Sequence, residues 1–189
     1  MGYMISAIAA LVVIAFYVLY VRLIKTRNKV HESMSDIDVQ LKKRYDLIPN
    51  LLNMAAKFME HEKKLMSELA EIRTRAMQNS FAANPKTKME IENLLNQKLG
   101  EFRVSLENYP DLKSNQTMIT AMQSMNEVEE HIAAARRFYN ANVNDLKNAV
   151  EIFPSSLVAN FLNITYENFP FFEINDVERK PINSQDYFK

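Results

Sequence analysis

The sequence predicts an all-α protein, an elongated antiparallel four-helix bundle preceded by an N-terminal transmembrane helix. Three observations lead to this prediction. Apolar residues recur at spacings of three and four along most of the chain, which is the period of an amphipathic helix. Only two glycines, Gly2 and Gly100, occur in 189 residues, too few for the frequent turns of a β-rich fold. Residues 3–21 contain no charged side chain.

Residues 3–21 are long enough to cross a bilayer. A helix of this length extends about 28 Å, close to the hydrocarbon thickness of about 30 Å. A signal peptide would carry basic residues before its apolar part and a small-residue cleavage site after it, and a buried core helix would show a polar stripe. Neither pattern is present. We therefore expect an uncleaved anchor over residues 1–24, and its bilayer-facing residues include Tyr3, Leu11, Phe16, Tyr20 and Val21.

Four basic residues follow the apolar segment and set the expected orientation. They are Arg22, Lys25, Arg27 and Lys29, whereas no basic side chain precedes the segment. Cytoplasmic flanks of membrane helices are enriched in Lys and Arg. The sequence therefore predicts a single-pass protein with its N-terminus outside and its remaining residues in the cytoplasm.

Residues 25–165 are predicted to form the helical bundle. The first helix covers residues 30–45 and continues the membrane helix without a break. The second covers residues 51–76 and begins behind Pro49, because proline suits the first turn of a helix. Short connections between such helices imply antiparallel neighbours that share one apolar seam.

The third helix covers residues 91–106, after a loop at residues 79–85 from which Pro85 can open it. The fourth and longest covers residues 118–153, with Asp111 or Ser114 as its N-cap and Pro154 as its stop. Residues 155–163 form a short helix. The remaining tail, residues 166–189, is expected to be extended and partly docked, with aromatic residues 169–174 packed on the bundle or on a neighbouring subunit.

Polar residues gather within residues 36–51 and again near residue 136. One interpretation is that they are solvated faces, in which Asp46 and Asn50 cap a helix turn. A second is a buried ionic network that fixes the register of the bundle, and a third is catalysis. The candidate residues of the structural network are Arg44, Asp46, Asn50, Glu129, Arg136 and Asn140.

Known signatures of chemistry do not match. The chain has no cysteine, and none of its three histidines completes a Glu-x-x-His or His-Glu-x-x-His motif. Two glycines leave no room for a phosphate-binding loop. Lysine plus arginine equals aspartate plus glutamate at 23 each, without the basic surplus of a nucleic-acid binder. We therefore predict no catalytic, cofactor-binding or metal-ligating residues and no nucleic-acid partner.

Several motifs in order along the chain resemble the LemA family of bacterial membrane proteins. They include residues 27–30, residues 37–51 with the sequence IDVQLKKRYDLIPNL, His61-Glu62, residues 109–113, Glu129 with residues 136–140, Val143, Phe153-Pro154 and residues 171–173. The resemblance implies an N-terminal anchor in the bacterial inner membrane and a cytoplasmic helical bundle. It implies no reaction, because the biochemical role of the family is poorly defined.

Three functions remain in competition on the sequence alone. The first is a non-enzymatic scaffold or interaction protein that presents a bundle at the membrane, as a homo-oligomer or with other membrane-associated proteins. The second is a sensor that couples the anchor to the bundle through a continuous first helix. The third is a hydrolase that uses the Arg, Asp and Glu residues of the polar clusters.

Overall fold

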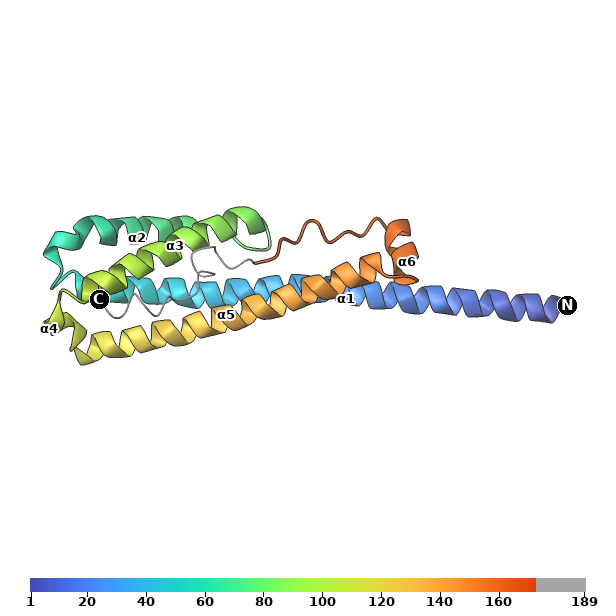
Figure 1. Ribbon diagram of the computed structural model, residues 1–189, viewed down its shortest axis with the longest axis horizontal. Helices are drawn as coiled ribbons and strands as arrows, with labels where there is room; N and C mark the ends of the chain where they lie inside the picture. Colours follow the sequence, from blue (N-terminus) through green and yellow to red (C-terminus); the bar gives the residue numbers. More distant parts are fainter. Residues whose placement is uncertain (173–189) are drawn as a thin grey trace, which may run out of the picture.

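The protein is a long assembly of helices in the computed structural model, which describes residues 1–172 (Figure 1). In chain order the elements are α1 (Gly2–Ala55), a 3-10 turn (Glu60–Glu62), α2 (Lys63–Met77), α3 (Pro85–Leu106), α4 (Pro110–Lys113), α5 (Gln116–Glu151) and α6 (Ser155–Phe161). Every regular element of this part of the chain is helical. The prediction of an all-α protein is therefore confirmed.

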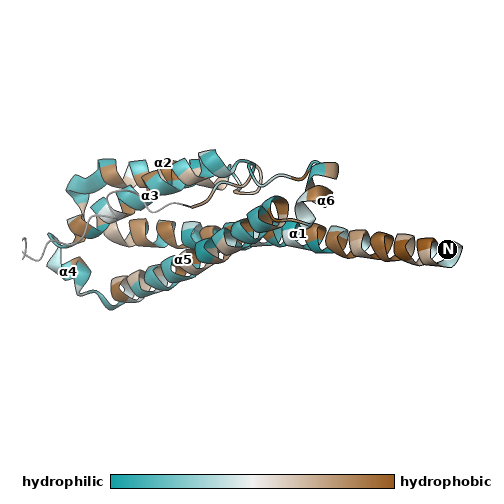
Figure 2. Ribbon diagram, turned by 45° about the vertical axis from the view of Figure 1, so that its right-hand side comes forward, coloured by the Kyte–Doolittle hydropathy of each residue, from teal (hydrophilic) through white to brown (hydrophobic). Residues whose placement is uncertain are grey.

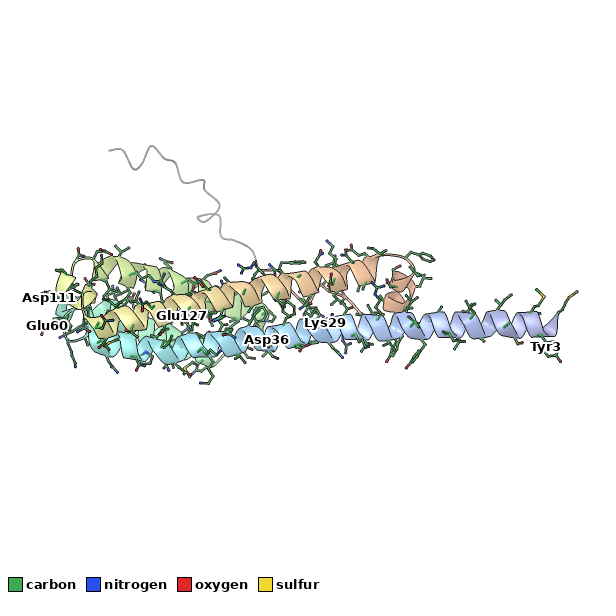
Figure 3. All side chains as sticks on the ribbon, turned by 90° about the horizontal axis from the view of Figure 1, so that it is seen from below. Tyr3, Lys29, Asp36, Glu60, Asp111 and Glu127 are labelled. Carbon is green, nitrogen blue, oxygen red and sulfur yellow. The ribbon has the colours of Figure 1, made fainter. Side chains whose placement is uncertain are left out.

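The two longest helices form the main axis of the molecule. Helix α5 lies along α1, and α2 and α3 form a helical hairpin beside them (Figure 1). Figure 3 shows Tyr3 at the free end of α1, with Glu60 and Asp111 at the opposite end of the molecule. One apolar core runs between these helices, built from residues such as Ile37, Leu41, Leu95, Ile132 and Leu146. Those residues repeat at helical spacing, so each helix buries one stripe.

Helix α1 is continuous from Gly2 to Ala55, as the sequence predicted. Its first part projects beyond the other helices and is strongly hydrophobic (Figure 2). Residues 1–18 are exposed, whereas Leu23 and Val30 are already buried in the core. By length and composition this helix is able to cross a membrane.

Pro49 lies inside α1, so the prediction that it begins a second helix was wrong. A proline within a helix removes one N–H donor and leaves the carbonyl four residues earlier without its helical partner. Here that carbonyl belongs to Tyr45, and the Nε of Arg73 in α2 donates to it at 2.7 Å. The chain leaves the helix only after Ala55 and resumes as α2 at Lys63.

The start of α5 also differs from the prediction. Asp111 belongs to the separate short helix α4, and the N-cap of α5 is Asn115 rather than Asp111 or Ser114. The side-chain oxygen of Asn115 accepts hydrogen bonds from the backbone N–H groups of Thr117 and Met118 at 2.9 and 3.3 Å. These bonds satisfy two of the free donors of the first turn.

Candidate functional site

Arg44 is the centre of a polar network inside the helices. It lies on the core-facing side of α1 and has no exposed surface. Its Nη1 donates to Asn96 Oδ1 of α3 at 2.6 Å and to Glu129 Oε1 of α5 at 3.0 Å. Its Nη2 donates to Glu92 of α3. The planar guanidinium therefore links three helices at once, as its fixed set of donors allows.

Glu92 joins Arg44 to two further polar side chains. The hydroxyl of Tyr45 donates to it, and the ammonium of Lys88 lies 3.6 Å away. Lys88 is itself 2% exposed and donates to the carbonyl oxygen of Ala76 at 2.6 Å. Ala76 lies in the last turn of α2, where carbonyl groups lack helical donors and favour a nearby cation. Through Lys88 the network therefore also reaches α2, in addition to α1, α3 and α5.

The charges of the network balance. Arg44 and Lys88 face the carboxylates of Glu92 and Glu129, so two positive groups meet two negative groups. Burial opposes the charge on Arg44, but attraction to Glu92 and Glu129 outweighs it and raises its pKa. Burial lowers the pKa of Lys88, although Glu92 opposes the shift. Burial, reinforced by Glu92, raises the pKa of Tyr45, so its hydroxyl remains a proton donor.

A carboxylate on α1 holds the loop between α2 and α3. The oxygens of Asp38 accept from the backbone N–H of Phe81 at 2.8 and 3.0 Å and from that of Ala82 at 3.4 Å. This places the Phe81 ring in the core, fully buried. The loop is thereby fixed against the middle of α1.

The Phe81 ring also contacts the end of the described chain. It stacks on Phe172 with ring centroids 4.9 Å apart and meets Tyr139 edge-on at 5.1 Å. Asn140 of α5 binds the Phe172 backbone in both directions, accepting from its N–H and donating to its carbonyl, each at 2.9 Å. The hydroxyl of Tyr139 donates to the Pro170 carbonyl at 3.0 Å. The aromatic segment therefore docks on this chain's own helices as far as Phe172, and Glu173 and Ile174 lie outside the described residues.

The candidates named from the sequence are distributed over two places. Arg44 and Glu129 meet in the network, while Asn140 and Arg136 lie at the docked segment, with the Arg136 guanidinium 5.0 Å from the centre of the Phe172 ring. Asp46 is 53% exposed and pairs with Lys42 on the preceding turn of the same helix. Asn50 is exposed as well, and neither it nor Asp46 caps a helix turn, because α1 continues past them.

Sequence reasoning missed the contribution of α3, namely Lys88, Glu92 and Asn96. A signal was present, because Lys88 and Glu92 lie seven residues before the buried Leu95 and Leu99. Two helical turns separate residues seven apart, so both charges occupy the core-facing stripe. A charged residue at such a position is the pattern that predicts a buried ion pair.

The residues that the sequence predicts to face the bilayer lie on the first part of α1. Tyr3, Leu11 and Phe16 are exposed on the projecting part of α1, and Tyr20 is 38% exposed. Val21 is half-buried. Among the basic residues that follow, Arg22, Lys25 and Lys29 are exposed and Arg27 is half-buried.

Beside Glu129 the surface is hollowed by a recess of about 260 Å³ whose lining includes Asn96, Arg103, Glu129 and Arg136. The Glu129 carboxylate is 30% exposed there and is held from beneath by Arg44. Among residues 1–172, no three His, Cys, Asp or Glu side chains gather closely enough to hold a metal ion. The lining of the recess therefore combines two arginines with a carboxylate that is already paired with Arg44.

Together these features define a class of protein. One long helix has an exposed apolar end, and its other part packs against further helices to which a charge-balanced network joins it. Comparison with known proteins gives the family. The LemA family model matches residues 33–185, and the chain belongs to the LemA family. It is similar to Protein LemA of Metamycoplasma hominis, with 20% identity over 175 residues that cover 90% of this chain and 78% of the relative.

Proposed function

We propose that this chain is a membrane-anchored, non-enzymatic scaffold that presents a rigid four-helix bundle at the inner face of the bacterial membrane. The observation that carries the proposal is the continuity of α1. Its residues 1–18 are exposed and uncharged, and its residues 23–55 contribute the core positions of the bundle. A helix shared between bilayer and bundle ties the direction of the bundle to that of the membrane-spanning segment, because no flexible joint separates them.

Orientation follows from the basic residues after the apolar segment. Arg22, Lys25 and Lys29 are exposed and available to anionic headgroups. With these residues on the cytoplasmic side, the N-terminus is outside and the bundle inside. A reporter fused at Lys189 tests the orientation, since activity of a reporter that works only outside the cytoplasm would reverse it.

The anchor is tested by substituting Leu11 and Ile14 together with arginine. Each arginine near the bilayer centre costs about 2.5–3.5 kcal/mol of insertion free energy, so the double variant should shift from the membrane fraction to the soluble fraction after alkaline extraction. The matched control replaces two exposed apolar residues of the bundle, Val104 and Phe138, with arginine. Release of both variants, or of neither, contradicts a specific role of residues 3–21 as the anchor.

A scaffold should bind the same partner proteins reproducibly. The first partner that we propose is a second copy of this chain. Lysine-directed crosslinking in native membranes, followed by affinity purification of a C-terminally tagged chain, should give discrete oligomers or a constant partner. A chain that remains monomeric without any reproducible partner contradicts the scaffold role. Hydrolysis of any substrate by the purified wild type, lost in a Glu129→Gln variant that keeps its stability, would favour an enzyme instead.

A sensor is the second candidate, and one observation favours it. Residues 21–27 are helical without interruption, so a displacement of the apolar part of α1 is transmitted to Arg44, which binds α3 and α5. Two alanines that lengthen α1 after Arg22 would rotate the bundle relative to the anchor by about 200°. A sensor should respond to this insertion, whereas a scaffold of fixed shape should retain its partners after a four-residue insertion, which rotates the bundle by about 400° and so nearly restores its original direction.

A further inference from the structure

The structure contains a second apolar surface beside α1, next to Phe16 and at the place where α5 ends and α6 begins. Helix α6 and the residues just before it expose the large side chains of Ile152, Phe153, Leu157 and Phe161, from 59% to 75% exposed. On its other side α6 buries Val158 and Ala159 against the helices. No charged residue occurs between Glu151 and Glu167. A seven-residue helix with an apolar outer face and no charge is unsuited to contact with water.

The position of this surface along α1 identifies what covers it. The ring of Phe161 meets the ring of Phe16 edge-on, with centroids 6.1 Å apart. Phe16 precedes Arg22 by six residues, so Phe161 lies about 9 Å along the helix axis beyond the first basic residue, on the anchor side. Figure 1 shows α6 beside the part of α1 that projects from the other helices.

A shorter membrane span does not remove α6 from the bilayer. If the span ended before Phe16, the apolar part of α1 would be about 20 Å long, well short of the hydrocarbon thickness of about 30 Å. A span that reaches Val21 therefore carries Phe161 into the same leaflet. Interfacial helices bury their apolar faces to about 5–10 Å at this boundary, which matches the offset of Phe161.

The surroundings of α6 also suit the interface. A recess between α1 and the end of α5 is lined by Arg22, Lys25 and Lys29 together with Ile152 and Phe153, and it contains one acidic residue, Asp145. Basic groups therefore lie next to apolar ones at the depth where lipid phosphates lie above acyl chains. We propose that α6 is a second membrane contact, an interfacial foot whose Phe153, Leu157 and Phe161 insert into the leaflet that the basic residues face.

This inference rests on the proposed anchor, and it adds a distinct mechanical consequence. A single spanning helix is free to tilt and rotate in the bilayer. A foot attached to α5 and packed on α1 would fix both the tilt and the rotation of the bundle. The two membrane contacts, the spanning part of α1 and α6, would also fix the direction in which each face of α5 points relative to the membrane.

The test uses single cysteines, because the chain has none of its own. An environment-sensitive fluorophore is attached at Leu157→Cys or Phe153→Cys on the foot, at Leu11→Cys in the anchor, and at Lys64→Cys, whose side chain is 91% exposed at the far end of the molecule. The full chain is reconstituted in phosphatidylcholine and phosphatidylglycerol vesicles that contain lipids brominated at shallow or at deep acyl positions. Far-UV circular dichroism verifies that each labelled chain keeps its helical content.

The foot predicts blue-shifted emission at Leu157 and Phe153, stronger quenching by shallow than by deep bromines, and at least threefold weaker quenching by aqueous iodide than at Lys64. Leu11 should be quenched most strongly by deep bromines. If Leu11 responds to bromine while both foot positions behave like Lys64, the foot is overturned and the anchor stands. If Leu11 does not respond either, the anchor itself has failed. Blue-shifted foot positions that no brominated lipid quenches would mean that protein covers α6, and this result also overturns the proposal.

Discussion

The Nε of Arg73 donates a 2.7 Å hydrogen bond to the Tyr45 carbonyl, the group that Pro49 leaves without a helical donor. A side chain of α2 thus replaces a backbone bond of α1. The same residue, Tyr45, sends its hydroxyl to Glu92 of α3. The break in the backbone ladder of α1 is therefore one of the places at which the helical hairpin attaches to α1.

Arg73→Ala should lower the free energy of unfolding by about 1–3 kcal/mol, because a partly buried carbonyl loses its charged donor. Pro49→Ala restores the missing backbone N–H, so Arg73→Ala should cost clearly less in that background. Urea unfolding of the full chain in detergent, followed by circular dichroism, measures the double-mutant cycle. Exposed Arg75 on the same helix supplies the control substitution Arg75→Ala. Equal costs with and without Pro49 would contradict the replacement of one bond by the other.

Arg44→Met should destabilise the protein by about 3–5 kcal/mol, since it leaves Glu92 and Glu129 without their shared cation. The control Lys42→Met removes an exposed pair on the same helix and should cost about 1 kcal/mol or less. Adding Glu129→Gln to Arg44→Met should recover part of the loss, because Glu129 is the carboxylate that Lys88 does not face, whereas Glu92 still has Lys88 beside it. A double variant as unstable as the sum of the single variants would show that the network does not act as a unit.

The course of the main helices was predictable because their apolar spacing is simple. Continuity of α1 followed from the absence of any breaker between Val21 and Val30. Pro49 misled the prediction for a physical reason: the residue that compensates it, Arg73, comes from another helix and leaves no local trace. The N-cap of α5 was predicted at Asp111 or Ser114 and lies at Asn115. Asp, Ser and Asn are all good caps, so residue type alone did not choose among them.

The site was only partly predictable for a related reason. Arg44 and Glu129 were identifiable as charges within apolar stripes, but their pairing with Glu92 depends on how α3 lies across α1 and α5. Asp46 and Asn50 follow Arg44 closely in sequence, yet helical geometry turns them to the exposed face. Asn140 was found for its polarity, whereas its partner is the backbone of Phe172, which no side-chain pattern reports.

Two tyrosines should make the protein sensitive to alkali. Burial and Glu92 raise the pKa of Tyr45, and burial raises that of Tyr139. The folded state therefore keeps protons that the unfolded state releases near pH 10, so this contribution is fully present below about pH 10 and is lost as the pH rises further. The free energy of unfolding should fall steeply above about pH 10. Tyr45→Phe and Tyr139→Phe should each make that fall shallower, even where they lower stability at neutral pH.

Phenolate absorbance checks the same point directly. In the wild type, ionisation of these two tyrosines should coincide with the loss of helical circular dichroism. Early, fully reversible ionisation of all tyrosines without loss of helix would contradict the assignment.

Asn140→Ala should release the docked segment without unfolding the helices. The substitution removes both hydrogen bonds to the Phe172 backbone, worth about 1–3 kcal/mol together, while the core residues of α1 and α5 remain in place. Amide hydrogen exchange at residues 164–172 should accelerate by roughly tenfold to a hundredfold, since about 1.4 kcal/mol corresponds to a factor of ten, with exchange in α3 unchanged. Asn144→Ala, an exposed asparagine one turn further along α5, is the matched control and should leave both regions as in the wild type. Equal acceleration in α3 and in residues 164–172 would instead mean that Asn140 supports the whole assembly, because the segment would then open only when the helices do.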